Sequence, residues 1–259
     1  MSLLNKLRET ADNTMKETAD TLGGFNVLAS GLYALRIKSM FYTASASGAI
    51  AVNIRAETQE GENVEFQDYV TNSTAKGGVN YYLDKSGARQ PMRGFATMDA
   101  LCRLTDGRGL MDIPTEVRHE EIYNVDDKKR VLTPVDMIEP MVGQIFYGGI
   151  LHTKENVNLK DAQGVYQPSD KYREENELDK VFNDRKLTIT EQNAGATEPT
   201  FCTKWEEANK DKLRDRSKTP VIMAADATPA KQATPGAVPS TMQTAPAVRT
   251  PASALFANG

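Results

Sequence analysis

The chain has 259 residues, of which 31 are Lys or Arg and 35 are Asp or Glu, so its formal net charge at pH 7 is -4. Hydrophobic residues make up 39% and charged residues 25%, which supplies enough apolar side chains for a folded core and excludes disorder of the whole chain. The longest apolar-leaning stretch without charges, residues 28–35, is far shorter than the roughly 20 residues that a membrane-spanning helix needs. We therefore expect a soluble, unexported protein that contacts no membrane.

The first 24 residues have the pattern of an amphipathic helix. Leu4, Leu7, Ala11 and Met15 recur at helical spacing through a polar stretch, and Gly23-Gly24 ends the pattern. The apolar stripe of such a helix packs on the folded body, or else it serves self-association or contact with a partner protein. The sequence leaves these alternatives open.

From residue 32 onward the hydrophobic period changes to two, which predicts three half-buried antiparallel strands over residues 32–42, 49–58 and 63–72. Residues 59–62 contain a glycine and suit a short hairpin turn. The inward positions are Tyr33, Leu35, Ile37, Ser39, Phe41, Ile50, Val52, Ile54, Val64, Phe66 and Val70. The outward positions are Ala34, Arg36, Lys38, Met40, Tyr42, Asn53, Arg55, Gln67 and Tyr69. One face of the sheet is therefore apolar, and the other is basic and aromatic.

The later elements are predicted from shorter patterns. Residues 74–91 indicate an exposed loop with a small hairpin, and the apolar spacing of residues 95–105 predicts a helix that Gly107 and Gly109 close. Further strands are expected at residues 121–125, 131–135 and 144–153, with a turn at 126–129, and further helices at 174–182 and 201–216. The last segment, 223–259, holds eleven Ala and five of the twelve Pro, so we expect a disordered tail.

This order of elements predicts a mainly β protein with helices, of the α+β class. Strands, an intervening helix and then strands again is the order of an OB-like antiparallel barrel whose helix follows the third strand. A generic α+β domain shows much the same alternation. We expect three parts: an N-terminal amphipathic helix over residues 1–24, an OB-like domain over 25–222 and a disordered Ala/Pro-rich tail over 223–259.

Signatures of catalysis and of metal binding are absent from the sequence. It contains no GxxxxGK[ST], no GxGxxG after a strand, no GxSxG, no HExxH and no DxDxD. Cys102 and Cys202 form no CxxC pair, and His119 and His152 lie near neither of them, so we expect no zinc site and two buried thiols. The sequence therefore predicts a protein that is not an enzyme and holds no metal or cofactor.

Basic and aromatic residues gather in two segments of this acidic chain. Residues 25–56 contain three basic and no acidic side chains, and residues 76–108 contain six basic and three acidic ones. Cations follow phosphates and flat rings stack on unpaired bases, so the combination indicates binding of single-stranded nucleic acid. The alternative is that Lys and Arg only populate solvent-exposed faces and that the tyrosines follow β-propensity. The candidate binding residues are Arg36, Lys38, Tyr42, Arg55, Tyr69, Lys76, Tyr81, Tyr82, Lys85, Arg89 and Arg93.

Three segments resemble a known family. The run Tyr69-Val-Thr-Asn-Ser-Thr-Ala-Lys-Gly-Gly78, the segment 84–104 and the run Glu175-Asn-Glu-Leu-Asp-Lys-Val-Phe182 are similar to the single-stranded DNA-binding proteins encoded by tailed bacteriophages, and Lys204-Trp205-Glu206 fits as well. The resemblance implies an OB-like fold that coats single-stranded DNA during phage DNA replication, recombination and repair. It also implies that the protein acts in the cytoplasm of the infected bacterial host. The loop 74–78 would lie beside the DNA groove.

The C-terminal segment departs from this functional type. Such proteins commonly end in an acidic tail with an apolar tip that recruits replication partners, whereas this tail is nearly neutral and only Leu255-Phe256 is similar to the tip. Leu255 and Phe256 are therefore the candidates for contact with phage replication proteins, and a plain flexible spacer is the alternative. A homo-oligomer is left open. The rival function is that of a phage structural or assembly protein that makes protein–protein contacts.

Overall fold

The computed structural model describes residues 27–124 and 128–221. The predicted N-terminal helix, the predicted tail and the partner candidates Leu255 and Phe256 lie outside the described residues. In chain order the elements are β1 (Gly31–Ala44), β2 (Ile50–Thr58), β3 (Asn63–Tyr69), η1 (Thr74–Lys76), β4 (Tyr81–Leu83), β5 (Arg89–Pro91), α2 (Arg93–Thr105), β6 (Glu116–Asn124), β7 (Lys129–Met137), η2 (Glu139–Met141), β8 (Ile145–Lys160), β9 (Tyr166–Phe182), α3 (Ile189–Asn193), α4 (Thr200–Asn209) and β10 (Leu213–Asp215). No helix among the described residues is long and apolar enough to cross a membrane.

The main sheet is antiparallel except at one edge. Its strand order is β10-β8-β1-β2-β3, and β9 pairs with β8 outside this path. Only β10 runs parallel to its neighbour. The first half of β1 pairs with β8, while its second half pairs with β7, which in turn pairs with β6. Among the described strands β3 and β9 do not pair with each other, so the sheet is open. The predicted mainly β, α+β class with antiparallel strands is confirmed.

The predicted alternation of β1 holds only as far as a bulge. Leu35 and Ile37 are buried as expected, but the register with β2 shifts between Ile37 and Ser39. One extra residue reverses which positions face the core. Beyond the bulge Met40 is therefore buried in the main core, and Phe41 packs on the opposite face. The predicted outward position of Met40 is wrong for this reason.

Helix α2 confirms the predicted helix and closes one end of the core. Met98, Leu101 and Cys102 form its buried face, and the helix packs against β3 and β9. The helix can approach β3 closely because residue 94 is glycine, where a Cβ would lie 2.3 Å from the carbonyl oxygen of Tyr69. Gly107 ends the helix with a φ of 86°, a left-handed conformation that favours glycine.

The C-terminal third contains the main errors of the sequence prediction. The predicted helix at 174–182 is wrong, because these residues belong to β9. A bulge in the pairing of β8 with β9 between Gly149 and Ile150 places Leu178, Val181 and Phe182 at the spacing of a helix although the backbone is extended. The predicted helix at 201–216 is correct only in its first part, since α4 ends at Asn209 and β10 follows.

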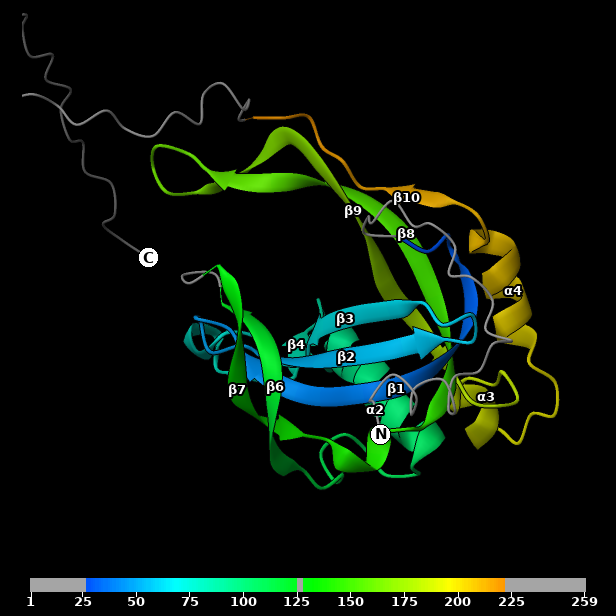
Figure 1. Cartoon of the computed structure of the whole chain (residues 1–259). Helices are drawn as coiled ribbons and strands as arrows, with labels where there is room; N and C mark the ends of the chain where they lie inside the picture. The colour runs from blue at the N-terminus through cyan, green and yellow to red at the C-terminus, as the bar shows by residue number, and fades with distance from the viewer. Residues whose placement is uncertain (1–26, 125–127, 222–259) are drawn as a thin grey trace, which may run out of the picture.

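Two long hairpins extend from the body as arms, one formed by β6 and β7 and the other by β8 and β9 (Figure 1). The β8–β9 arm curves over the molecule, and α4 covers its outer side near the body (Figure 1). The β6–β7 arm is held by a small hydrophobic cluster of Phe41, Val135 and Met137, with Ile122 packed against it. The body and its two arms set the positions of the candidate residues.

Candidate nucleic-acid interface

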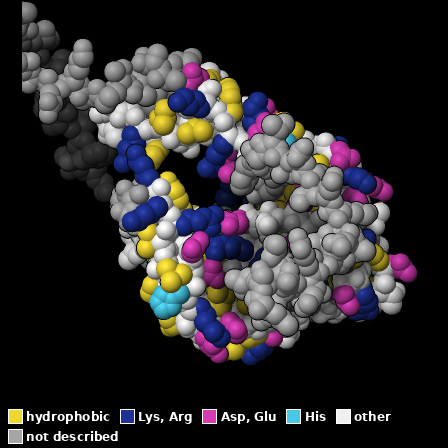
Figure 2. Space-filling model, in the orientation of Figure 1, with side chains coloured by type: hydrophobic (Ala, Val, Ile, Leu, Met, Phe, Trp, Pro, Cys, Tyr) yellow, Lys and Arg dark blue, Asp and Glu magenta, His cyan; other side chains and the backbone are white. Residues whose placement is uncertain are grey.

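A hollow separates the outer parts of the two arms. Figure 2 shows this opening on the face from which β6 and β7 rise, with Lys and Arg side chains at its rim. Basic side chains at the edge of a hollow attract a polyanion, because low-dielectric walls focus the field of the charges. A Lys or Arg side chain that is already paired with a carboxylate is less available to a phosphate, so the contacts of each one decide its availability.

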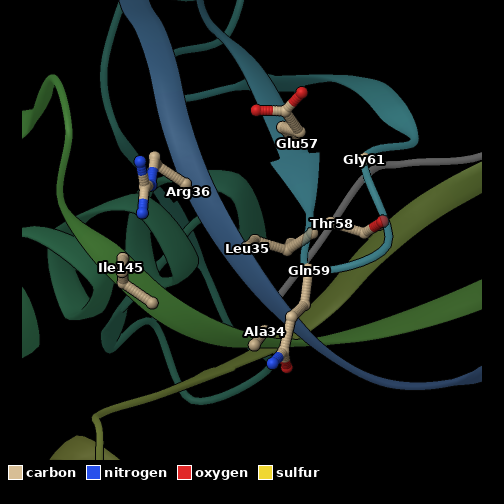
Figure 3. A pocket seen from close by; sticks show the side chains of 8 residues that line it. All are labelled: Ala34, Leu35, Arg36, Glu57, Thr58, Gln59, Gly61 and Ile145. Carbon is tan, nitrogen blue, oxygen red and sulfur yellow. The ribbon is translucent and has the colours of Figure 1, made fainter. Parts of the chain in front are cut away.

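Arg36 lines a groove of about 580 Å³ on the outward face of β1. It stands between Glu57 on β2 and Ile145 on β8, its register partners on the two sides (Figure 3). The Arg36 side chain is exposed and has no ion-pair partner among residues 27–124 and 128–221. As far as the described residues are concerned, its guanidinium is therefore available to an anion, beside the exposed apolar surface of Ile145.

The predicted small hairpin is present as β4 and β5. The guanidinium of Arg89 lies 4.6 Å from the centre of the Tyr81 ring, within the range of a cation–π contact. Tyr82 is 56% exposed, and Lys76 and Lys85 are exposed in the neighbouring η1 and in the hairpin turn. Five of the predicted binding residues therefore lie on or next to one exposed hairpin.

Asp84 holds the turn of this hairpin. Its Oδ1 accepts hydrogen bonds from the Ser86 hydroxyl at 2.6 Å and from the backbone N–H groups of Ser86 and Ala88 at 2.9 and 3.0 Å. The Gln90 side-chain amide donates to its Oδ2 at 3.1 Å. The hydrogen bonds from Ser86 and Gln90 lower the pKa of Asp84 to about 2. The carboxylate thus stays ionised and keeps the hairpin in shape at neutral pH.

Three predicted cations are already paired with carboxylates. Lys38 lies 3.3 Å from Glu57 and also donates to Asn63. Arg55 is paired with Glu65 at 3.3 Å and with Glu120. Arg93 is paired with Glu177 and, at 3.4 Å, with Asp179. Arg93 ties the start of α2 to β9, and Arg55 ties the sheet to the β6–β7 arm. Their role in nucleic-acid binding stays a prediction, and it requires a phosphate to compete with these carboxylates.

The two outward tyrosines predicted on strands have different surroundings. Tyr42 packs against the main core because of the bulge in β1, and its hydroxyl donates to the carbonyl oxygen of Leu110 at 3.3 Å. Burial raises the pKa of Tyr42 to about 12. The predicted outward position of Tyr42 is therefore wrong, whereas Tyr69 on β3 is exposed as predicted.

The β8–β9 arm carries aromatic and basic residues that the sequence reasoning missed. Lys154 lies over the ring of Tyr172 and Lys160 over that of Tyr166, at 4.6 and 5.2 Å from the ring centres. A signal was available, because the two lysines are six residues apart and so are the two tyrosines. The sequence prediction missed this signal because it places a helix at 174–182 and no strand at the residues just before it.

The described part of the chain shows no metal-binding cluster and no reactive thiol. No cluster of three or more His, Cys, Asp or Glu side chains that could hold a metal ion occurs there. The predicted burial of Cys102 and Cys202 is confirmed, and burial raises the pKa of both thiols, that of Cys102 to about 12. Such thiols are inert at neutral pH, since the thiolate is the nucleophile.

Comparison with known proteins gives no family assignment. No protein-family model matches this chain, and no curated protein is significantly similar to it.

Proposed function

We propose that this protein binds single-stranded DNA without base specificity and without catalysing a reaction. Phage DNA replication, recombination and repair in the cytoplasm of the infected bacterium are the setting that the family resemblance suggests. Lys and Arg side chains would neutralise phosphates while tyrosine rings stack on unpaired bases, a mode that tolerates any base sequence because every base has a flat face.

The observation that carries the proposal is that some exposed Lys and Arg side chains are not paired with carboxylates of the described residues. Arg89 lies on the half-buried ring of Tyr81, and Arg36 has no carboxylate partner in the described part of the chain. Cations that are paired with carboxylates lose most of their attraction for a phosphate, whereas a cation on a ring keeps its charge. Tyr82, next to Tyr81, presents an exposed ring.

The topology supports an OB-like interpretation of the fold. Strands β1, β2 and β3 form a meander, α2 follows the third strand, and β8 and β9 return to pair beside β1. In this interpretation β6 and β7 are a hairpin inserted after the helix, and β8–β9 is the elongated hairpin of the last two barrel strands. OB-folds are partly open barrels that bind oligonucleotides on a sheet face and its flanking loops.

A titration of fluorescently labelled oligo-dT tests the proposal, with duplex DNA of the same length as the comparison. We expect binding of the single strand at low salt, with an affinity that falls by about 0.7 log units per decade of salt for each phosphate neutralised. The double variant Tyr81→Ala, Tyr82→Ala should bind more weakly, by about 1–3 kcal/mol for each base that loses its stacking partner. No binding of oligo-dT by the wild type at low salt would refute the proposed function.

A matched control is Tyr123→Ala on β6, which removes an exposed ring from the β6–β7 arm. If Tyr123→Ala weakens binding as much as the hairpin variant does, stacking is not specific to β4–β5. Circular dichroism and a thermal melt of each variant show whether the fold is retained.

A second candidate function, that of a phage structural or assembly protein, is favoured by a separate groove of about 1160 Å³. It lies between the β6–β7 arm and the body, and exposed apolar side chains such as Met111 and Val117 line it. Apolar grooves of this kind suit protein partners. Mass spectrometry of purified virions distinguishes the two functions, because a structural protein is abundant in virions and a replication protein is absent from them.

A further inference from the structure

Two lysine–tyrosine pairs repeat along the outer half of the β8–β9 arm. Lys154 and Lys160 are six residues apart on β8, and Tyr166 and Tyr172 are six residues apart on β9. Residues an even number apart project from the same face of a strand. The two pairs therefore share one face of the arm, and each brings an ammonium within about 5 Å of a ring centre.

The register of the arm agrees with this placement. Lys160 is directly opposite Tyr166, and Lys154 is diagonal to Tyr172 across the strand pair. The irregularity between Asn156 and Asn158 adds two residues to β9, and an even number of extra residues leaves the alternation of faces unchanged.

These two lysines form no close ion pair with a carboxylate of the described residues, although the charge of Lys154 acts on Asp215. Neither Lys154 nor Lys160 has an ion-pair partner among the described residues, whereas Arg173 on the same arm lies 3.4 Å from Glu175. The rings are also accessible, since Tyr166 is 64% and Tyr172 is 47% exposed. In Figure 2 basic side chains lie against hydrophobic ones on the outer part of this arm.

We propose that Lys154, Tyr172, Lys160 and Tyr166, which we name the Lys–Tyr ladder, form a second contact for single-stranded DNA. This inference rests on the proposed function and extends it to residues outside the predicted interface. Each lysine covers one face of its tyrosine, so each ring offers its other face to one unpaired base while the ammonium meets an adjoining phosphate. Bases in a duplex are already stacked and do not offer their faces, so the ladder selects single strands.

The spacing sets how the strand lies on the ladder. Tyr166 and Tyr172 are opposite Lys160 and Asn156, four residues apart on β8, so the rings are separated by about 13 Å along the arm and the bases stacked on them are not neighbours in sequence. The ladder therefore lengthens the binding site by several nucleotides beyond the contacts at the β4–β5 hairpin and Arg36. A short oligonucleotide can occupy one region, whereas a longer one occupies both.

The test compares wild-type protein with the double variant Tyr166→Ala, Tyr172→Ala over a series of oligo-dT lengths. We expect the wild-type affinity to rise as the oligonucleotide becomes long enough to reach the ladder, and the variant to lack this rise. At the longest lengths the variant should bind about 30-fold more weakly or worse, given what two stacked bases contribute. The variant Tyr166→Phe, Tyr172→Phe keeps both rings and should retain the wild-type affinity.

An oligonucleotide with abasic positions provides a second readout. If bases stack on the ladder, abasic sites should weaken the wild type and have little further effect on the alanine double variant, so the two losses are not additive. Equal affinities of the wild type and the alanine variant at all lengths, with the β4–β5 variant weakened, would overturn the ladder and leave the proposed function intact. Failure of the wild type to bind any oligonucleotide would overturn both.

Discussion

The two arms differ in what their cations contact. On the β6–β7 side, Arg55 and Arg130 are paired with carboxylates, Arg55 with Glu65 and Glu120, and Arg130 with Glu65 at 3.6 Å. On the β8–β9 arm, Lys154 and Lys160 lie on exposed tyrosine rings instead. The difference teaches that a count of basic residues does not locate a binding surface. The partner of each cation decides whether its charge serves the fold or is free for a ligand.

The largest expected effect concerns the attachment of the β6–β7 arm. Phe41→Ala removes the buried ring that joins β1 to Val135 and Met137, and replacement of a buried Phe by Ala typically costs about 3–5 kcal/mol. We expect a correspondingly lower free energy of unfolding in urea and faster hydrogen exchange over residues 116–124 and 129–137. If the arm exchanges as slowly as in the wild type, the cluster does not hold it.

Lys154 and Lys160 of the other arm should appear in the salt dependence of DNA binding. Lys154→Gln together with Lys160→Gln removes two charges that are expected to neutralise phosphates, so the slope of log affinity against log salt should decrease by about 1.4. The measurement is an oligo-dT titration at several salt concentrations. Lys38→Gln is the matched control, because Lys38 is paired with Glu57 and its loss should change the slope less.

Release of a paired arginine should have a smaller, opposite effect. Glu120→Gln removes one carboxylate partner of Arg55 and gives its guanidinium more freedom to meet a phosphate. We expect the affinity for oligo-dT to rise about two- to fivefold, which corresponds to the roughly 0.4–1 kcal/mol of a partly exposed ion pair. An unchanged affinity for this variant and for Glu65→Gln would show that Arg55 serves the fold alone.

The smallest effect concerns Tyr42, which the bulge removes from the outward face. Burial raises the pKa of Tyr42 from 10.0 to about 12, so the folded state favours the protonated hydroxyl. The stability that this provides is fully present below about pH 10 and is lost as the pH rises to about 12. Tyr42→Phe cannot ionise, so its free energy of unfolding should decline less between pH 9 and 11 than that of the wild type. Parallel declines would contradict the burial of this hydroxyl.

Much of the fold was accessible from local patterns. The first three strands, the hairpin turn at Gly61, the helix that ends at Gly107 and the small hairpin of residues 81–91 were all predicted within a few residues. Two errors occurred where bulges interrupt an alternation, at Tyr42 in β1 and at 174–182 in β9, and a third where β10 follows α4 within the helix predicted at 201–216. A bulge is decided by the partner strand, which local periodicity does not reveal.

The types of residue in the candidate interface were predictable from the sequence, but their positions in the fold were predictable only in part. Tyr81, Tyr82, Lys85 and Arg89 lie on one exposed hairpin, as their spacing within a short loop suggested. The Lys–Tyr ladder was missed because its members come from two strands and meet only when the strands pair.

The sequence by itself determined the β-rich class, the alternation of β1 as far as its bulge and the turns, because these depend on residues a few positions apart. Tertiary structure alone decided which cations remain free. Arg55 meets Glu120 across 65 residues and Arg93 contacts Asp179 across 86, and only the folded chain brings such pairs within reach of an ion pair. The mild net negative charge therefore says little about the interface, because the charge of each site is set by neighbours that are distant in sequence.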